Sequence, residues 1–162
     1  MSTEIKKILY ATDLGTHMRP VFRYAVTLAR ACGAKISMLH VSDVFTPDVH
    51  WAIHTYMPTA DPREIEQQWM KELQERMRGR LADFCRSELG QSPEETNLVA
   101  DVRAVAGKPA DTIVRMADEW KVDLIVVGTH TDTSFGAGLL GSTARKVTRM
   151  STKPVLVVPV AE

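Results

Sequence analysis

A glycine-rich stretch between an apolar run and a basic segment is the part of this sequence best suited to bind an anion. It reads VVGTHTDTSFGAGLLGSTARKV and runs from Val126 to Val147. Glycines between a strand and a helix let backbone N–H groups approach a phosphate, and the helix dipole also favours an anion there. The stretch is therefore the first candidate for a ligand-binding loop. The alternative is a flexible connection whose glycines only satisfy local turns.

This stretch does not properly match either of two standard phosphate-binding patterns. Gly136 and Gly141 have the spacing of a P-loop, but Ser142 and Thr143 follow where a P-loop has lysine and then serine or threonine. The letters GAGLLG also fit the dinucleotide pattern G-x-G-x-x-G, which must directly follow a strand, and here a long loop separates it from the preceding apolar run. We therefore exclude a P-loop ATPase or kinase and give the dinucleotide pattern no weight.

The segments that must position this loop alternate between strand and helix patterns. Alternation of this kind predicts right-handed crossovers and a parallel sheet covered by helices on both faces. The helix expected at 63–89 carries an apolar stripe that includes Trp69, and Phe45–Pro62 carries three prolines and is expected to be an irregular insertion. Short β-prone runs occupy 5–13, 34–43, 97–107, 122–128 and 154–160, and the remaining helix patterns occupy 18–33, 109–121 and 142–151.

We expect an α/β fold in which residues 1–162 form a single domain around an open, doubly wound, five-stranded parallel sheet. In such a sheet the chain starts centrally, and ligands bind outside the carboxyl ends of the strands where the strand order reverses. With the first strand central, the reversal lies between the first and fourth strands. The loop ATDLGT after the first strand and the glycine-rich loop after the fourth then border the same crevice.

Composition excludes several other classes of protein. The 20 basic and 20 acidic residues balance, so the chain has no electrostatic footprint for nucleic acid or an anionic membrane. No apolar run approaches the ~20 residues that a membrane span requires, and the start lacks the features of a signal peptide. Cys32 and Cys85 lack metal-type spacing, which indicates free thiols in a reducing compartment. We expect a cytoplasmic protein that binds neither nucleic acid nor membrane.

The whole chain resembles the universal stress protein family. That family carries the motif G-x2-G-x9-G-[ST] between a strand and a helix, and Gly128, Thr131, Gly141 and Ser142 occupy its positions. Further matching segments are ILYATD, HVSD, GKPADTIV, VDLIVVGTH and KPVLVVP. The resemblance implies the nucleotide-binding α/β fold of that family, with strand order 3-2-1-4-5 and helices on both faces.

The resemblance also implies a ligand and a set of contacts. The ligand is ATP, or alternatively ADP or AMP, with Mg²⁺ when a triphosphate is bound. Asp13 would contact the ribose hydroxyls, since a carboxylate accepts two hydroxyl hydrogen bonds; the alternative is an acid that stabilises a turn. Val41 would face adenine, or alternatively is a plain strand residue. The other implied contacts are Ala11 and Thr12 with the base and sugar, Val127 and Gly128 with the sugar and phosphates, and Gly141, Ser142 and Thr143 with the phosphates.

Two departures from the family pattern leave a second function open. Thr131 replaces the second glycine of the motif, and Asp132 stands where the family often has a basic residue. A carboxylate near a triphosphate is repulsive unless a metal ion intervenes. The alternative is therefore a stress or interaction protein of the same fold that binds no nucleotide. We expect no enzyme, although slow ATP hydrolysis stays open, because ATDLGTH lacks the motif of the adenylating enzymes of the wider superfamily.

Two further expectations concern a metal and a partner. His50 and His54 have the i, i+4 spacing of a metal site, but HWAIH lacks the acid that H-E-x-x-H places beside the first histidine, so we expect no metal there. The last strand is expected at an edge of the sheet and is too apolar to stay uncovered. The resemblance implies a homodimer that pairs this strand with its copy, over a length that Pro159 limits.

Overall fold

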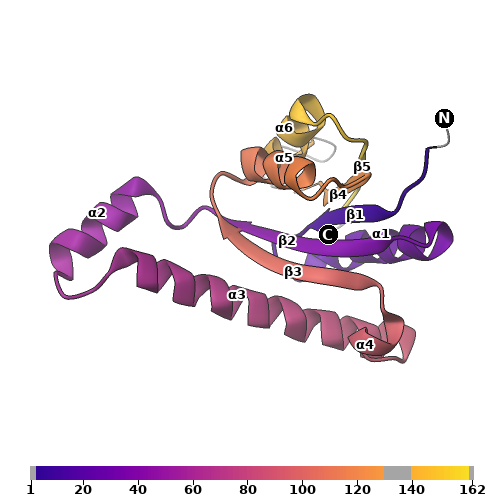
Figure 1. The fold of residues 1–162 in the computed structure, drawn as a ribbon, viewed down its shortest axis with the longest axis horizontal. Helices are drawn as coiled ribbons and strands as arrows, with labels where there is room; N and C mark the ends of the chain where they lie inside the picture. Colours follow the sequence, from indigo (N-terminus) through magenta and orange to yellow (C-terminus); the bar gives the residue numbers. More distant parts are fainter. Residues whose placement is uncertain (1–2, 130–139, 161–162) are drawn as a thin grey trace.

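Five parallel strands form one sheet in the order β3-β2-β1-β4-β5 (Figure 1). The computed structural model describes residues 3–129 and 140–160. All four pairings between neighbouring strands are parallel. The expected strand order is therefore confirmed. The strands are β1 (Lys7–Ala11), β2 (Lys35–Ser42), β3 (Val99–Ala106), β4 (Leu124–Gly128) and β5 (Val155–Val158).

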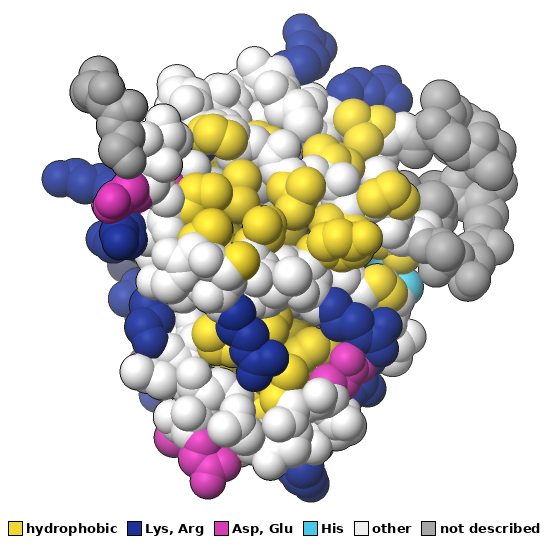
Figure 2. Space-filling view, turned by 90° about the vertical axis from the view of Figure 1, so that its right-hand side faces the viewer, with side chains coloured by type: hydrophobic (Ala, Val, Ile, Leu, Met, Phe, Trp, Pro, Cys, Tyr) yellow, Lys and Arg dark blue, Asp and Glu magenta, His cyan; other side chains and the backbone are white. Residues whose placement is uncertain are grey.

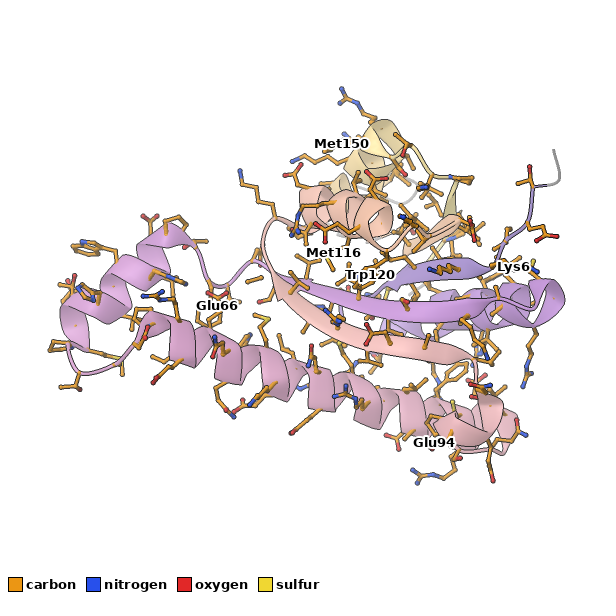
Figure 3. The ribbon with its side chains drawn as sticks, in the orientation of Figure 1. Lys6, Glu66, Glu94, Met116, Trp120 and Met150 are labelled. Atoms are coloured by element: carbon orange, nitrogen blue, oxygen red, sulfur yellow. The ribbon has the colours of Figure 1, made fainter. Side chains whose placement is uncertain are left out.

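Helices cover both faces of this sheet. The helices are α1 (Arg19–Cys32), α2 (Pro47–Tyr56), α3 (Pro62–Phe84), α4 (Pro93–Thr96), α5 (Pro109–Glu119) and α6 (Ser142–Met150), with short turns η1 (Thr16–Met18) and η2 (Cys85–Leu89). Along β1, Ile8 and Tyr10 join a core with α1 and α3, while Leu9 and Ala11 join a second core with α5 and α6. This alternation follows from the two-residue period of a strand. From α5, Met116 and Trp120 point toward the sheet (Figure 3).

The prediction of an irregular insertion at Phe45–Pro62 is wrong, because helix α2 occupies most of that segment. The prolines flank helices and do not interrupt one: Pro47 begins α2, and Pro62 begins α3. Proline suits a first helical position because the N–H that it lacks has no acceptor there. The Oγ1 of Thr46 accepts a hydrogen bond from Val49 N at 3.3 Å and caps α2, while Asp61 caps α3. Within the described residues, no helix is long and apolar enough to cross a bilayer.

The helix predicted at 63–89 also differs in detail from the helix that the structure shows. The α-helix ends at Phe84, a π-helical turn continues to Leu89, and Gly90 then adopts a left-handed conformation with φ of 64°. Trp69 is exposed although its spacing placed it on the buried stripe. The reason is geometric, because the first half of α3 extends past the sheet together with α2 (Figure 1). The stripe becomes buried only where α3 lies along the sheet, at Leu73, Met77, Leu81 and Phe84.

Gly128, at the end of β4, is required by packing. A Cβ atom added there would lie 2.9 Å from Val160 Cγ2, 3.0 Å from Val21 Cγ2 and 3.2 Å from Met18 Sδ. These atoms belong to the core on the α1 side of the sheet. Because Gly128 has no side chain, β4, α1 and the segment after β5 can pack closely together. This packing requirement is independent of any contact between Gly128 and a ligand.

We expect Gly128→Ala to lower the free energy of unfolding by about 1–3 kcal/mol, the usual cost of an extra methyl group in a well-packed core. Chemical denaturation followed by circular dichroism measures this change. The matched control is Gly79→Ala, because Gly79 lies in α3 with no atom within 4 Å of an added Cβ. The control should be stabilised by about 0.5–1 kcal/mol through higher helix propensity. Equal stability of the Gly128 variant and the wild-type protein would contradict this account.

Candidate functional site

A cavity of about 750 Å³ opens at the carboxyl ends of β1 and β4, where the strand order reverses. The amino ends of α5 and α6 contribute Pro109 and Ser142 to its wall. The structure brings together every candidate residue that it describes, while Thr131 lies outside the described residues, as does Asp132. The candidates that line the cavity are Ala11, Thr12, Asp13, Val41, Val127, Gly128, Gly141, Ser142 and Thr143.

One end of the cavity is formed by the turn after β1. Oδ1 of Asp13 accepts a hydrogen bond from Gly15 N at 2.7 Å, and Oδ2 lies 2.8 Å from Nε2 of His17. A Cβ atom on Gly15 would lie 2.1 Å from Cε1 of His17, so a larger residue at this position would have to displace the His17 ring from Asp13. Asp13 therefore does stabilise a turn, as the alternative interpretation expected. Its side chain is 43% exposed, and a carboxylate can accept several hydrogen bonds.

Hydrogen bonds fix the same turn to the end of β2. Thr12 N donates to Leu39 O at 2.9 Å, and Leu14 N donates to Oγ1 of Thr12 at 3.0 Å. Nδ1 of His40, in β2, lies 2.8 Å from the carbonyl oxygen of Thr12 and is hydrogen-bonded to it. The backbone around Thr12 is thereby held by β2, and the half-buried Val41 lies one residue further along that strand.

The opposite end of the cavity is the amino end of α6. Gly141 is the N-cap residue, and among the residues that the structure describes no side chain caps the helix. The first backbone bond within the helix is donated by Arg145 N to Gly141 O at 2.9 Å, so the N–H groups of residues 142–144 have no acceptor inside the helix. The first turn of α6 contains no acidic residue, and the guanidinium of Arg145, which donates to Leu140 O at 3.2 Å, also lines the cavity. This end is suited to an anion.

Between these two ends the wall is apolar. Leu39 and Ile113 are buried side chains that line the cavity beside Ala11 and Val127. An apolar wall with polar groups at both ends suits a ligand that has a planar ring at one point and charged groups at another. The sequence prediction missed Leu39, Asp43, Pro109 and Ile113. The helix that follows the third strand must start at the same edge of a parallel sheet, and that rule could have found Pro109 and Ile113.

The histidines at 50 and 54 both lie in α2, and one of them faces a carboxylate of α3. Nε2 of His50 lies 2.8 Å from Oε2 of Glu66, which joins α2 to α3. Glu66 is turned toward α2 in Figure 3. Across residues 3–129 and 140–160, no group of three side chains is arranged to hold a metal ion.

Comparison with known proteins agrees with this geometry. A sequence model of the Universal stress protein family matches residues 4–159. Universal stress protein MJ0577 of Methanocaldococcus jannaschii is 27% identical over 162 residues, which cover 98% of this chain and 97% of that protein. The universal stress protein of Methanothermobacter thermautotrophicus is 31% identical over 142 residues, 88% of this chain and 87% of that protein.

Solved structures share the fold. The structure of MJ0577 superposes with a TM-score of 0.70 at 27% identity and covers 98% of both chains. A universal stress protein in complex with cAMP superposes with a TM-score of 0.60 at 24% identity, covering 98% of this chain and 99% of its own. The family match extends over nearly the whole sequence and includes the cavity and both strands that border it. The chain therefore belongs to the universal stress protein family.

Proposed function

We propose that this protein binds an adenine nucleotide, ATP or alternatively ADP or AMP, in the cavity between β1 and β4, and that it acts by binding and not as an enzyme. The observation that carries the proposal is the uncapped amino end of α6, which opens into a cavity whose opposite end holds the Asp13 carboxylate. An anion at one end and vicinal hydroxyls at the other are the features of a nucleoside phosphate. The stress response is the cellular role that family membership suggests.

Each candidate residue has a role in this proposal. Asp13 accepts hydrogen bonds from the ribose hydroxyls, and Ala11, Thr12 and Val41 contact the base and sugar. Val127 and Gly128 border the sugar and phosphates, while the backbone N–H groups and hydroxyls of Ser142 and Thr143 hold the phosphates next to Gly141. Because the described residues contain no metal-binding cluster, Mg²⁺ enters only as the companion of a bound triphosphate.

A fold neighbour supports the class of ligand. The universal stress protein in complex with cAMP shows that an adenine nucleotide is bound by a protein of this architecture. The competing function is that of a nucleotide-free interaction protein, supported by Thr131 and Asp132, which depart from the family motif. The competing function predicts that Thr131→Gly together with Asp132→Arg creates nucleotide binding that the wild-type protein lacks. Our proposal predicts binding by the wild-type protein itself.

We expect the wild-type protein to bind ATP with Mg²⁺ in a calorimetric titration, and ADP and AMP to compete. Asp13→Ala should weaken binding about 10- to 100-fold, because it removes hydrogen bonds to a charged acceptor. The matched control is Glu119→Ala, which removes an exposed carboxylate at the far end of α5 and should leave the affinity unchanged. The absence of heat with all three nucleotides would contradict the proposal.

We also propose a homodimer that pairs β5 with its copy, because the two edges of the sheet differ in how they are covered. On β3, the outward N–H groups of Val102 and Ala104 are bonded to Oδ1 of Asp101 at 2.9 Å and to Oε1 of Gln74 at 3.1 Å. Side-chain acceptors and α3 thus already protect that edge.

The β5 edge lacks such protection. The carbonyl oxygens of Pro154 and Val158 accept bonds from β4, so the alternate residues Val155 and Val157 direct their backbone groups away from the sheet. Among the residues that the structure describes, no side chain hydrogen-bonds to these outward groups. Apolar side chains gather in a band across the face of the molecule that Figure 2 shows. An uncovered apolar edge is a template for pairing with another strand.

We expect Val157→Pro to weaken this dimer about 10- to 100-fold, because a two-fold interface loses one N–H donor from each protomer. The sheet itself should survive, since proline is tolerated at an outward position of an edge strand. Val157→Thr keeps the β-branched shape and the N–H group and is the matched control. Sedimentation velocity over a range of concentrations measures the association, and an unchanged dissociation constant in the proline variant would argue against pairing through β5.

A further inference from the structure

Helix α2 and the first half of α3 form an arm that projects beyond the sheet (Figure 1). We define the arm as residues 44–70. Within it, the Phe45 ring lies 6.4 Å from the Trp69 ring, and His50 pairs with Glu66 at 2.8 Å. Helix α2 contains no buried residue at all. These contacts join the two helices of the arm to each other, but they do not give the arm a core of its own.

The arm carries most of the exposed large apolar side chains among the described residues. Outside the arm only Tyr24 and Met150 belong to this group. Within it the exposed fractions are 50% for Val44, 63% for Trp51, 76% for Tyr56, 52% for Met57 and 38% for Trp69. A helix as short as α2 is marginal in water by itself and is normally stabilised by packing an apolar face. The arm therefore leaves exposed the large apolar side chains whose burial would stabilise its helices.

The exposed area is large enough for an interface. Aromatic side chains present 150–250 Å² each, so the exposed parts of these five side chains add up to roughly 500 Å². Trp51 and Tyr56 contact each other with ring centroids 6.3 Å apart, and the summed exposed area is comparable with the ~300–600 Å² of the largest apolar patch on a typical monomer. It also supplies more than half of the ~800 Å² that each partner buries in a stable complex. Polar neighbours on the same helices can supply the remainder.

We propose that the arm binds the arm of a second copy of this protein, so that two α2–α3 pairs form a four-helix arrangement. Four helices are a common architecture in which helical pairs bury a shared apolar core, and a two-fold axis lets one patch face itself. Asp48 is the only Asp, Glu, Lys or Arg of α2, which also carries His50 and His54, so a seam formed by two copies of this helix contains few charges. The arm projects beyond the end of the sheet, so its tip lies away from the body of the molecule (Figure 1).

This interface is separate from the edge of β5. The arm follows β2, which is separated from β5 by β1 and β4 in the sheet. A protein with both interfaces forms assemblies larger than a dimer, and Val157→Pro weakens the β5 contribution. Association that persists in the Val157→Pro protein and is lost on changing arm residues is then the association of arms.

The experiment is sedimentation velocity on Val157→Pro protein with and without the additional changes Trp51→Glu and Tyr56→Glu. The parent should form dimers as concentration rises, and the arm variant should raise the dissociation constant at least about 30-fold, the effect of losing a hot-spot aromatic residue. Tyr24→Glu is the matched control, because Tyr24 is 57% exposed on α1, outside the arm, and its change should leave the dimer intact. A parent that stays monomeric at every concentration, or an arm variant that dimerises like the parent, would overturn the proposal.

A second measurement does not depend on a disruptive change. In protein with Trp69→Phe and Trp120→Phe, Trp51 is the only tryptophan, and its emission maximum should move to shorter wavelength as dimers form. Protein with Trp51→Phe and Trp69→Phe keeps only Trp120, packed against the α5 core, and should show no such shift. A constant Trp51 emission maximum while the mass doubles would place the interface elsewhere and refute the pairing of arms.

Discussion

Strand β1 pairs in parallel with both β2 and β4, and this central position produces the candidate site. The chain builds the sheet outward from β1 on one side and then on the other, so the segments that leave β1 and β4 at their carboxyl ends diverge and leave a cavity between them. One wall carries the Asp13 turn, which is held to β2 through Thr12 and His40. The other carries the amino end of α6, whose first N–H groups have no acceptor inside the helix. The chemistry of both walls depends on this single feature of topology.

Much of this arrangement was predictable from the sequence. Alternating strand and helix patterns predicted the parallel sheet. The candidate site was predictable because the loops that follow β1 and β4 must meet in this topology. Gly128 was assigned to the site for a ligand, whereas its contacts with Val21 and Met18 show a packing requirement that only the three-dimensional structure could reveal.

The parts that the sequence did not predict share a physical cause. Helix α2 was missed because prolines that begin helices resemble prolines that break them until their neighbours are known. The exposure of Trp69 was not predicted because helical spacing identifies the apolar face of a helix. It does not show how far along the helix that face is covered by the sheet. In both cases tertiary contacts decide the outcome. The resulting arm and the edge of β5 are places where the described part of the chain leaves apolar surface uncovered.

The central claim is that the ends of one nucleotide meet the Asp13 turn and the amino end of α6 at the same time. Titration of isotope-labelled protein with ATP and Mg²⁺, followed through backbone amide resonances, tests this claim most directly. The account predicts that the amides of Gly15, Ser142 and Thr143 shift together with one dissociation constant. Shifts confined to one of these walls, or amides there that do not respond while others do, would contradict it.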